Sequence, residues 1–186
     1  MLTLITGGSG SGKSAFAEQY VQTIAQGRRV YIATMADYEE ESRKKIDRHR
    51  RMRAGKGFLT LEQPHSLEQI SNQIGLEDTL LLEDLPNLLA NHIWMLQDPQ
   101  PVSAILNGLQ QLEAGCRHLV VVTGELFGDG VRYLDDTGRY LCLMGQLHQI
   151  LAQRAQRVVE VVYTIPIYHK GAQPQPTAAK PKKETV

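Results

Sequence analysis

Gly7-Gly8-Ser9-Gly10-Ser11-Gly12-Lys13-Ser14 is the stretch that decides the fold of this chain. It follows directly on the apolar, β-prone run Leu2-Thr3-Leu4-Ile5-Thr6 and precedes the helix-forming run Ala15-Phe16-Ala17-Glu18-Gln19-Tyr20. A glycine, four residues and then Gly-Lys-Ser between a strand and a helix is the spacing of the phosphate-binding P-loop. The motif therefore predicts a strand–loop–helix unit that binds the phosphates of a nucleoside triphosphate.

Each part of this motif has a physical role. Successive backbone N–H groups of the loop point inward and form a nest for phosphate oxygens, and the following helix adds the positive end of its dipole. Lys13 is expected to reach the β- and γ-phosphates, and Ser14 to offer its hydroxyl to Mg²⁺. The alternative, a glycine-rich turn without a ligand, is disfavoured by the complete motif in the right context.

Composition and charge narrow the class of protein. The chain has 186 residues, 42% of them hydrophobic, which suits one α/β domain. Its 20 basic and 20 acidic residues cancel, so no overall field favours nucleic acid or a membrane surface as a partner. No apolar run is long enough to span a bilayer. Met1 leads straight into the first predicted strand, which leaves no room for a signal peptide. Cys116 and Cys142 show no metal-ligand or redox spacing and are expected to be reduced thiols. We therefore expect a cytoplasmic protein.

The order of apolar segments predicts an open, mostly parallel sheet with helices on both faces. Continuous apolar runs, typical of strands buried on both sides, are found at residues 2–6, 29–34, 79–83, 118–123 and 157–163. Helical patterns lie between them at residues 14–26, 36–52, 66–74, 86–96, 102–115 and 137–155. Ligands of such sheets bind beyond the carboxyl ends of the strands. We predict one domain over residues 1–170 and a disordered tail, rich in proline and lysine, over residues 171–186.

A second constellation is the charged segment 37–53. Taken alone, acidic residues followed by basic ones describe a solvated helix face. However, Arg48, Arg50, Arg51 and Arg53 surround His49 with positive charge, which disfavours its protonated form. A neutral imidazole is a nucleophile, and guanidinium groups hold phosphate oxygens well. His49 is therefore a candidate nucleophile toward phosphorus.

The chain resembles the bifunctional adenosylcobinamide kinase / adenosylcobinamide-phosphate guanylyltransferase family. The matching residues, in order, are Thr6 to Ser14, Tyr31-Ile32-Ala33-Thr34, Lys45-Ile46-Asp47-Arg48-His49-Arg50, Arg53, Thr60, Glu62, Pro64 and Leu80-Leu81-Leu82-Glu83. The resemblance covers most of residues 1–170. It implies a RecA-like P-loop fold, a homotrimer and two reactions. First, ATP or GTP phosphorylates the aminopropanol hydroxyl of adenosylcobinamide; then GMP passes from GTP through a guanylyl-histidine intermediate to that phosphate, releasing pyrophosphate.

The resemblance also assigns roles to residues. His49 matches the nucleophile and Lys13 stabilises charge on the triphosphate. The positions matching the nucleotide site are Gly7, Gly8, Ser9, Gly10, Ser11, Gly12, Lys13, Ser14, Ala33, Thr34, Met35, Arg50, Arg51, Met52, Arg53, Glu62 and Glu83. Ser14 would hold Mg²⁺ together with an acid that follows the apolar strand at residues 79–82. Glu83 and Asp84 both stand there; Glu83 is favoured because it matches the family, and Asp84 is alternatively a helix cap before Pro86. Glu62 either binds guanine or is an ordinary carboxylate at a strand end.

Some positions depart from the family pattern. The usual Asn-Glu-Val-Gly reads Gly124-Glu125-Leu126-Phe127, and the usual Gly-Arg-x-Asn-Gln reads Gly145-Gln146-Leu147-His148-Gln149. These changes leave open a protein with an altered kinase half, whose general base could be His49, Glu83 or Glu125. His65, His92, His118 and His148 match no role and are expected on the surface or in packing.

Two other functions remain possible from the sequence. One is a different small P-loop kinase acting on a metabolite hydroxyl, which needs no histidine adduct. The other is a nucleotide-dependent switch, in which binding or hydrolysis only moves loops.

Overall fold

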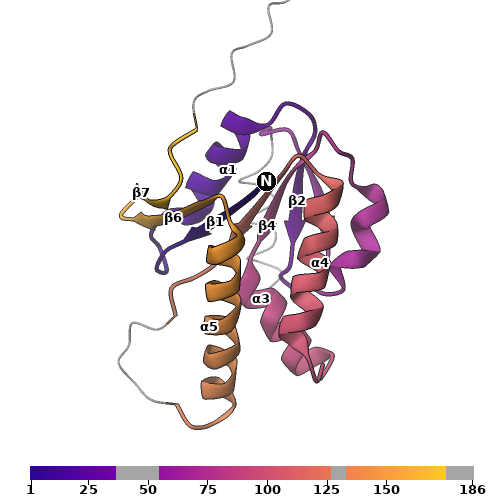
Figure 1. The fold of residues 1–186 in the computed structure, drawn as a ribbon, viewed down its shortest axis with the longest axis vertical. Coiled ribbons are helices and arrows are strands. Elements are labelled where there is room, and N and C mark those ends of the chain that lie inside the picture. The colour runs from indigo at the N-terminus through magenta and orange to yellow at the C-terminus, as the bar shows by residue number, and fades with distance from the viewer. Residues whose placement is uncertain (37–54, 127–132, 175–186) are drawn as a thin grey trace, which may run out of the picture.

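The computed structural model describes residues 1–36, 55–126 and 133–174. Within these ranges the chain forms one seven-stranded sheet in the order β3-β2-β4-β5-β1-β6-β7 (Figure 1). The elements, in chain order, are β1 (Leu2–Thr6), α1 (Lys13–Ile24), β2 (Arg29–Ala33), β3 (Phe58–Glu62), η1 (Leu67–Gln73), β4 (Thr79–Glu83), α3 (Leu85–Ala90), η2 (Asn91–Met95), α4 (Pro101–Gly115), β5 (His118–Val122), α5 (Asp136–Arg154), β6 (Arg157–Val162) and β7 (Ile165–Lys170).

The sheet is parallel apart from its last strand. β1 pairs in parallel with β5 on one side and β6 on the other, while β7 pairs antiparallel with β6. β4, the strand before Glu83, is separated from β1 by β5. Because parallel strands end at the same edge, the segments after β1, β2, β4 and β5 meet there, as the sequence predicted.

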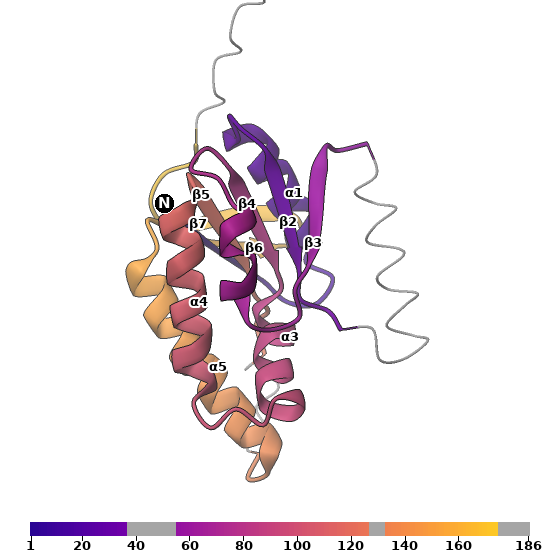
Figure 2. The same ribbon diagram turned by 90° about the vertical axis from the view of Figure 1, so that its right-hand side faces the viewer.

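Helices cover both faces of the sheet, and each face buries its own core. Leu80 and Leu82 of β4 pack in the cluster that includes residues of η1, α3, α4 and α5. Leu81, between them, packs in the opposite cluster with Val21 of α1. This alternation follows from the period of two along a strand. Figure 2 shows α4 and α5 on one side of the strands and α1 on the other.

Within the described residues, the predicted elements agree closely with the structure, with two differences. The predictions omitted β3 and β7, which lie at the two edges of the sheet. The helix predicted over residues 86–96 is α3 followed by the π-helical turn η2. The helix predicted over residues 36–52 lies outside the described residues, as do residues 175–186 of the predicted disordered tail. No helix among the described residues is long and apolar enough to cross a membrane.

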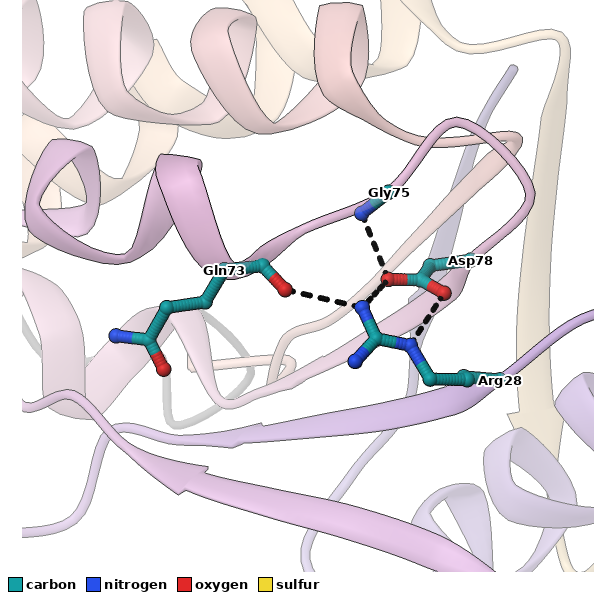
Figure 3. Close-up of polar contacts among 4 residues, drawn as sticks. All are labelled: Arg28, Gln73, Gly75 and Asp78. Carbon is teal, nitrogen blue, oxygen red and sulfur yellow. Dashed lines mark hydrogen bonds and ion pairs between the residues drawn. The ribbon is translucent and has the colours of Figure 1, made fainter.

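A polar clamp fixes the sheet at the edge opposite the P-loop (Figure 3). The guanidinium of Arg28, just before β2, donates from Nε to Asp78 Oδ1 at 2.9 Å and from Nη2 to Asp78 Oδ2 at 2.6 Å. The same nitrogen donates to the Gln73 carbonyl at 3.0 Å, and the Gly75 N–H donates to Asp78 Oδ2 at 2.8 Å. Hydrogen bonding to Arg28 lowers the pKa of Asp78, although burial of the carboxyl opposes this shift. The clamp joins the starts of β2 and β4.

Candidate functional site

The loop Gly7–Ser14 links β1 to α1 and curls back on itself. The Ser11 N–H donates to the Gly8 carbonyl at 3.2 Å, and the Phe16 N–H opens the helix by donating to the Gly12 carbonyl at 3.0 Å. Gly12 has φ +89°, a left-handed conformation that side chains rarely adopt. A Cβ on Gly7 would lie 2.5 Å from the Val161 carbonyl oxygen. Space therefore requires a glycine at positions 7 and 12, and a left-handed backbone conformation favours one at position 12.

Two side chains of the loop are arranged for an anion. Lys13 Nζ donates to the Gly8 carbonyl at 3.3 Å, which places the ammonium group across the loop. The Ser11 hydroxyl is buried and has no hydrogen-bond partner among the described residues. Buried polar groups are nearly always hydrogen-bonded in folded proteins. A phosphate oxygen in the loop would supply the partner that Ser11 lacks.

The loop is held in place by segments distant in sequence. The Thr164 N–H, in the turn between β6 and β7, donates to the Ser11 carbonyl at 2.8 Å. The Glu125 N–H, after β5, donates to the Gly7 carbonyl at 3.1 Å. The strands on either side of β1 therefore fix the nest from both flanks.

Glu83 and Asp84 at the end of β4 have different surroundings. Asp84 caps α3, accepting at Oδ1 from the Asn87 N–H at 2.9 Å and from Asn87 Nδ2 at 2.8 Å. Glu83 Oε2 accepts from the Tyr31 hydroxyl at 3.0 Å. Because Glu83 follows Leu81 by two residues, it lies on the face that α1 covers, the helix whose first turn contains Ser14. The helix-cap interpretation therefore holds for Asp84, and Glu83 remains the candidate for the metal.

The ends of β2, β3 and β4 form one network. Ala33 lies beside both Glu62 and Glu83 in the sheet register. The Thr34 hydroxyl accepts from the Asp84 N–H and donates to the Asp84 carbonyl, both at 2.7 Å. The fully buried Thr34 side chain thereby joins the end of β2 to the end of β4. Its neighbours Ala33 and Met35 are partly accessible to solvent.

Sequence reasoning did not single out Asn91, which completes this network. Its side-chain amide donates to the Thr34 carbonyl and to the Pro64 carbonyl, both at 2.8 Å. Asn91 is buried on the π-helical turn η2. The sequence does contain one indication of this role: Asn91 is an amide on an otherwise apolar helix face. A buried amide of this kind needs hydrogen-bond partners inside the protein.

His148 was also expected only in surface or packing roles, but it lies against the end of β5. Its Nε2 is 2.7 Å from Thr123 Oγ1, and Thr123 is buried. Burial lowers the pKa of His148, and the nearby charge of Glu125 partly opposes this shift. His148 follows the buried Met144 by four residues, so helical spacing already placed it on the inward face of α5.

A cavity of about 310 Å³ opens beside the P-loop. It is lined by Gly8, Ser9, Gly10, Ser11, Glu125, Glu160, Val161, Val162 and Tyr163. The cavity lies toward β6, whereas Glu83, Ala33 and Glu62 lie on the other side of β1. The nest thus has an open side toward the β6–β7 hairpin.

Five of the predicted site residues lie outside the described residues: His49, Arg50, Arg51, Met52 and Arg53. Their predicted roles as nucleophile and nucleotide ligands stay predictions. Among the residues that the structure describes, no group of three or more His, Cys, Asp or Glu side chains could hold a metal.

Comparison with protein families gives one match over most of the chain. The family model described as cobinamide kinase / cobinamide phosphate guanyltransferase matches residues 3–168. The chain is 33% identical to the bifunctional adenosylcobalamin biosynthesis protein CobP of Pseudomonas aeruginosa over 177 residues, covering 92% of this chain and 98% of that protein. It is 30% identical to the bifunctional adenosylcobalamin biosynthesis protein CobU of Escherichia coli, covering 87% and 96% of the two chains.

Similar solved structures support the predicted fold. The KaiC-like protein PH0186 of Pyrococcus horikoshii has a TM-score of 0.52 at 14% identity, over 95% of this chain and 82% of that one. A second solved structure, of an ATPase domain, has a TM-score of 0.50 at 16% identity, over 86% and 68% of the two chains. These likenesses concern the fold alone, and they confirm a RecA-like P-loop architecture.

Proposed function

Because the chain belongs to the cobinamide kinase / cobinamide phosphate guanyltransferase family, we propose how its residues carry out the two reactions. The protein is a transferase of cobalamin biosynthesis, with cobinamide kinase and guanylyltransferase activities. The observation that supports the proposed site most directly is the nest of residues 7–14, with Lys13 across it and the unpartnered Ser11 hydroxyl inside it.

In the kinase step, the terminal phosphoryl group of a nucleoside triphosphate passes to the aminopropanol hydroxyl of adenosylcobinamide. The bond from the γ-phosphorus to its bridging oxygen breaks as the hydroxyl oxygen bonds to phosphorus. Lys13 and the loop N–H groups stabilise the charge on the phosphates, which is the main task of a protein in phosphoryl transfer. His49, Glu83 and Glu125 remain the candidates for the base that takes the hydroxyl proton. Of these, Glu125 lines the cavity beside the nest.

In the guanylyl transfer, His49 attacks the α-phosphorus of GTP. A nitrogen–phosphorus bond forms while the bond to the pyrophosphate oxygen breaks, and the nest holds the leaving pyrophosphate. An oxygen of cobinamide phosphate then bonds to the same phosphorus and the nitrogen–phosphorus bond breaks. Covalent catalysis of this kind replaces one difficult transfer with two easier ones. The residues proposed to surround the guanylyl group are Arg50, Arg51, Met52, Arg53, Ala33, Thr34, Met35 and Glu62.

The residues present fit a magnesium ion bound together with the nucleotide. Mg²⁺ prefers oxygen ligands and is commonly held through one or two protein groups plus substrate phosphates. The Ser14 hydroxyl and the Glu83 carboxylate would provide those groups. When bound, the ion neutralises charge on the phosphates and on the leaving pyrophosphate.

We also propose a homotrimer in the cytoplasm. Trp94 is 51% exposed and stacks on Tyr140 with ring centroids 5.3 Å apart. Its neighbours Met95 and Leu96 are exposed as well. Apolar groups gathered on a surface mark interaction sites. Light scattering of the purified protein would test the assembly, and a monomeric mass would contradict it.

The mass of the intact protein after incubation with GTP and Mg²⁺ tests the proposed guanylyl transfer. We expect the gain of one GMP, labile to acid and stable to base, and no gain in His49→Ala. Transfer of the γ-phosphoryl group of labelled ATP to adenosylcobinamide tests the kinase half separately. GTP binding without an adduct would contradict the role of His49.

A further inference from the structure

The two proposed reactions place different demands on one P-loop. Phosphoryl transfer breaks a bond at the γ-phosphorus, whereas guanylyl transfer breaks a bond at the α-phosphorus. Among the described residues, those proposed for the guanylyl group are Ala33, Thr34, Met35 and Glu62, which lie at the ends of β2 and β3. These two strands lie three and four positions from β1, roughly 14 and 19 Å away at the usual strand spacing. The guanylyl donor therefore extends from the nest toward β3.

The cavity of about 310 Å³ lies on the opposite side of the nest, toward β6. This volume is at the lower end for small-ligand sites. The nest residues Gly8 to Ser11 form one wall, so a ligand there is continuous with phosphates in the loop. The half-buried Val162 contributes an apolar surface, and Tyr163, which is 87% exposed, is also part of the lining.

The turn that carries Tyr163 is fixed to the P-loop. Tyr163 and Thr164 both have positive φ, 50° and 68°, a conformation uncommon for residues other than glycine. The Thr164 N–H donates to the Ser11 carbonyl at 2.8 Å. In addition, Thr164 Cγ2 lies 2.8 Å from the position that a Cβ on Gly12 would occupy. The exposed ring is thus held beside the nest by direct contact between the turn and the loop.

The acidic residues that line the cavity favour the nucleoside of a nucleotide over its phosphates. Glu125 and Glu160 bring two carboxylates, which repel phosphate but accept hydrogen bonds from ribose hydroxyls and from an exocyclic amine. Glu160 Oε2 is 2.8 Å from His169 Nε2, which fixes that side chain. A planar base stacks on an exposed aromatic ring. The cavity therefore suits a purine nucleoside whose phosphates occupy the nest.

We propose that this cavity binds the nucleoside of the phosphoryl donor in the kinase step, with its base on Tyr163. The inference rests on the proposed pair of reactions. The two nucleotides share the nest but extend from it in opposite directions along the sheet, the kinase donor toward β6 and the guanylyl donor toward β3. One P-loop thereby presents the γ-phosphorus in one reaction and the α-phosphorus in the other.

The test compares Tyr163→Ala, Tyr163→Phe and the wild type in both reactions. For Tyr163→Ala we expect the KM for ATP in cobinamide phosphorylation to rise roughly 5- to 10-fold, with kcat nearly unchanged, because an aromatic stack is lost. The rate of GMP attachment at a given GTP concentration should stay at the wild-type value. Tyr163→Phe, which keeps the ring, should resemble the wild type in both reactions.

Calorimetric binding of a non-hydrolysable ATP analogue provides a readout independent of turnover. The proposal is supported if Tyr163→Ala binds the analogue more weakly than both the wild type and Tyr163→Phe. This holds even if the wild type has no kinase activity. Absence of kinase activity would contradict only the proposed kinase function. Equal losses in both reactions, unchanged ATP binding, or a change in oligomeric state by light scattering would each overturn it. Melting temperatures of the variants show whether the hairpin remains folded.

Discussion

At the scale of single residues, the Ser11 hydroxyl is a buried group that has no partner among the described residues. Ser11→Ala should leave the free energy of unfolding of the ligand-free protein unchanged or slightly higher, since no protein hydrogen bond is lost. Affinity for Mg·GTP should fall roughly 5- to 30-fold, as expected for one hydrogen bond to a charged group. Thermal melting with and without Mg·GTP measures both effects.

Ser9 supplies the matched control for this change. It belongs to the same loop but is exposed. Ser9→Ala keeps the backbone N–H through which position 9 belongs to the nest, so it should alter neither stability nor affinity by a comparable amount. If the two variants weaken nucleotide binding equally, the Ser11 hydroxyl does not have the role assigned to it.

His148 gives a pH dependence whose sign follows from its pKa. Burial lowers this pKa in the folded protein, so the unfolded chain binds the proton first as the pH falls. Stability from this group is therefore complete above about pH 6.5 and is lost below it. His148→Asn, which keeps an amide for Thr123, should reduce the loss of stability on the acid side. Urea unfolding between about pH 5 and pH 8 measures this slope.

His118 must be considered in the same experiment. Burial lowers its pKa too, with additional effects from the chain's amino terminus, Arg117 and Arg157. His118→Asn should remove a separate part of the slope, and the double variant should show the sum. An unchanged slope in His148→Asn would contradict the assignment.

At the scale of elements, β4 ends in two acids with separable functions. Glu83→Gln should lower both transferase activities, by on the order of 100-fold if its charge holds the metal at the transition state, with little change in melting temperature. Asp84→Ala should instead cost ~1 kcal/mol of stability through the lost helix cap of α3. Activity assays and chemical denaturation of the two variants distinguish the roles. Asp84→Asn, which retains an acceptor for the Asn87 N–H, is the control for the cap.

The turn η2 supports the nucleotide site through Asn91. Asn91→Ala leaves the buried Thr34 carbonyl and the half-buried Pro64 carbonyl without this donor, so we expect a loss of ~2–4 kcal/mol in the free energy of unfolding. The ends of β2 and β3 should also lose their fixed spacing, which raises the KM for GTP. Denaturant unfolding checks the first effect, and a change below ~0.5 kcal/mol would contradict it. Asn87→Ala on neighbouring α3 serves as the control.

The elements also show how far the sequence predicts this fold. Strands buried on both faces appear as continuous apolar runs, and all five of these were predicted within a residue or so. β3 and β7 are edge strands in which exposed and half-buried residues are mixed, and Pro166 interrupts β7. Their pairing is decided by neighbours rather than by their own composition, so local pattern did not reveal them.

The same distinction applies to the site. The P-loop was predictable because its residues are consecutive, and the capping alternative for Asp84 followed from Pro86 nearby. Asn91, His148 and Glu160 gain their positions from sheet order and register, which join segments far apart in the chain. No local motif specifies such contacts. His49 and its arginines were predicted from the sequence and lie outside the described residues.

At the scale of the whole molecule, the Arg28–Asp78 clamp lies at the edge of the sheet opposite the nucleotide site. Asp78→Asn should lower the melting temperature by several degrees while activity per folded molecule stays near that of the wild type. Because the pKa of Asp78 is lowered in the folded state, its contribution is present above about pH 4 and is lost as the pH falls through the folded pKa. Melting curves at descending pH should therefore converge for the variant and the wild type. Parallel curves would contradict the assignment.

The position of β1 between β5 and β6 affects how the molecule is made. β1 leaves the ribosome before the other described strands, yet its partners are residues 118–122 and 157–162. At about 5–20 residues per second, the wait for the second partner is roughly 8–30 s. During translation, an apolar strand with two unpaired sides is prone to aggregate. The nascent chain therefore passes through an interval in which β1 can pair wrongly, and the nest gains both of its flanks only after β6 has been made.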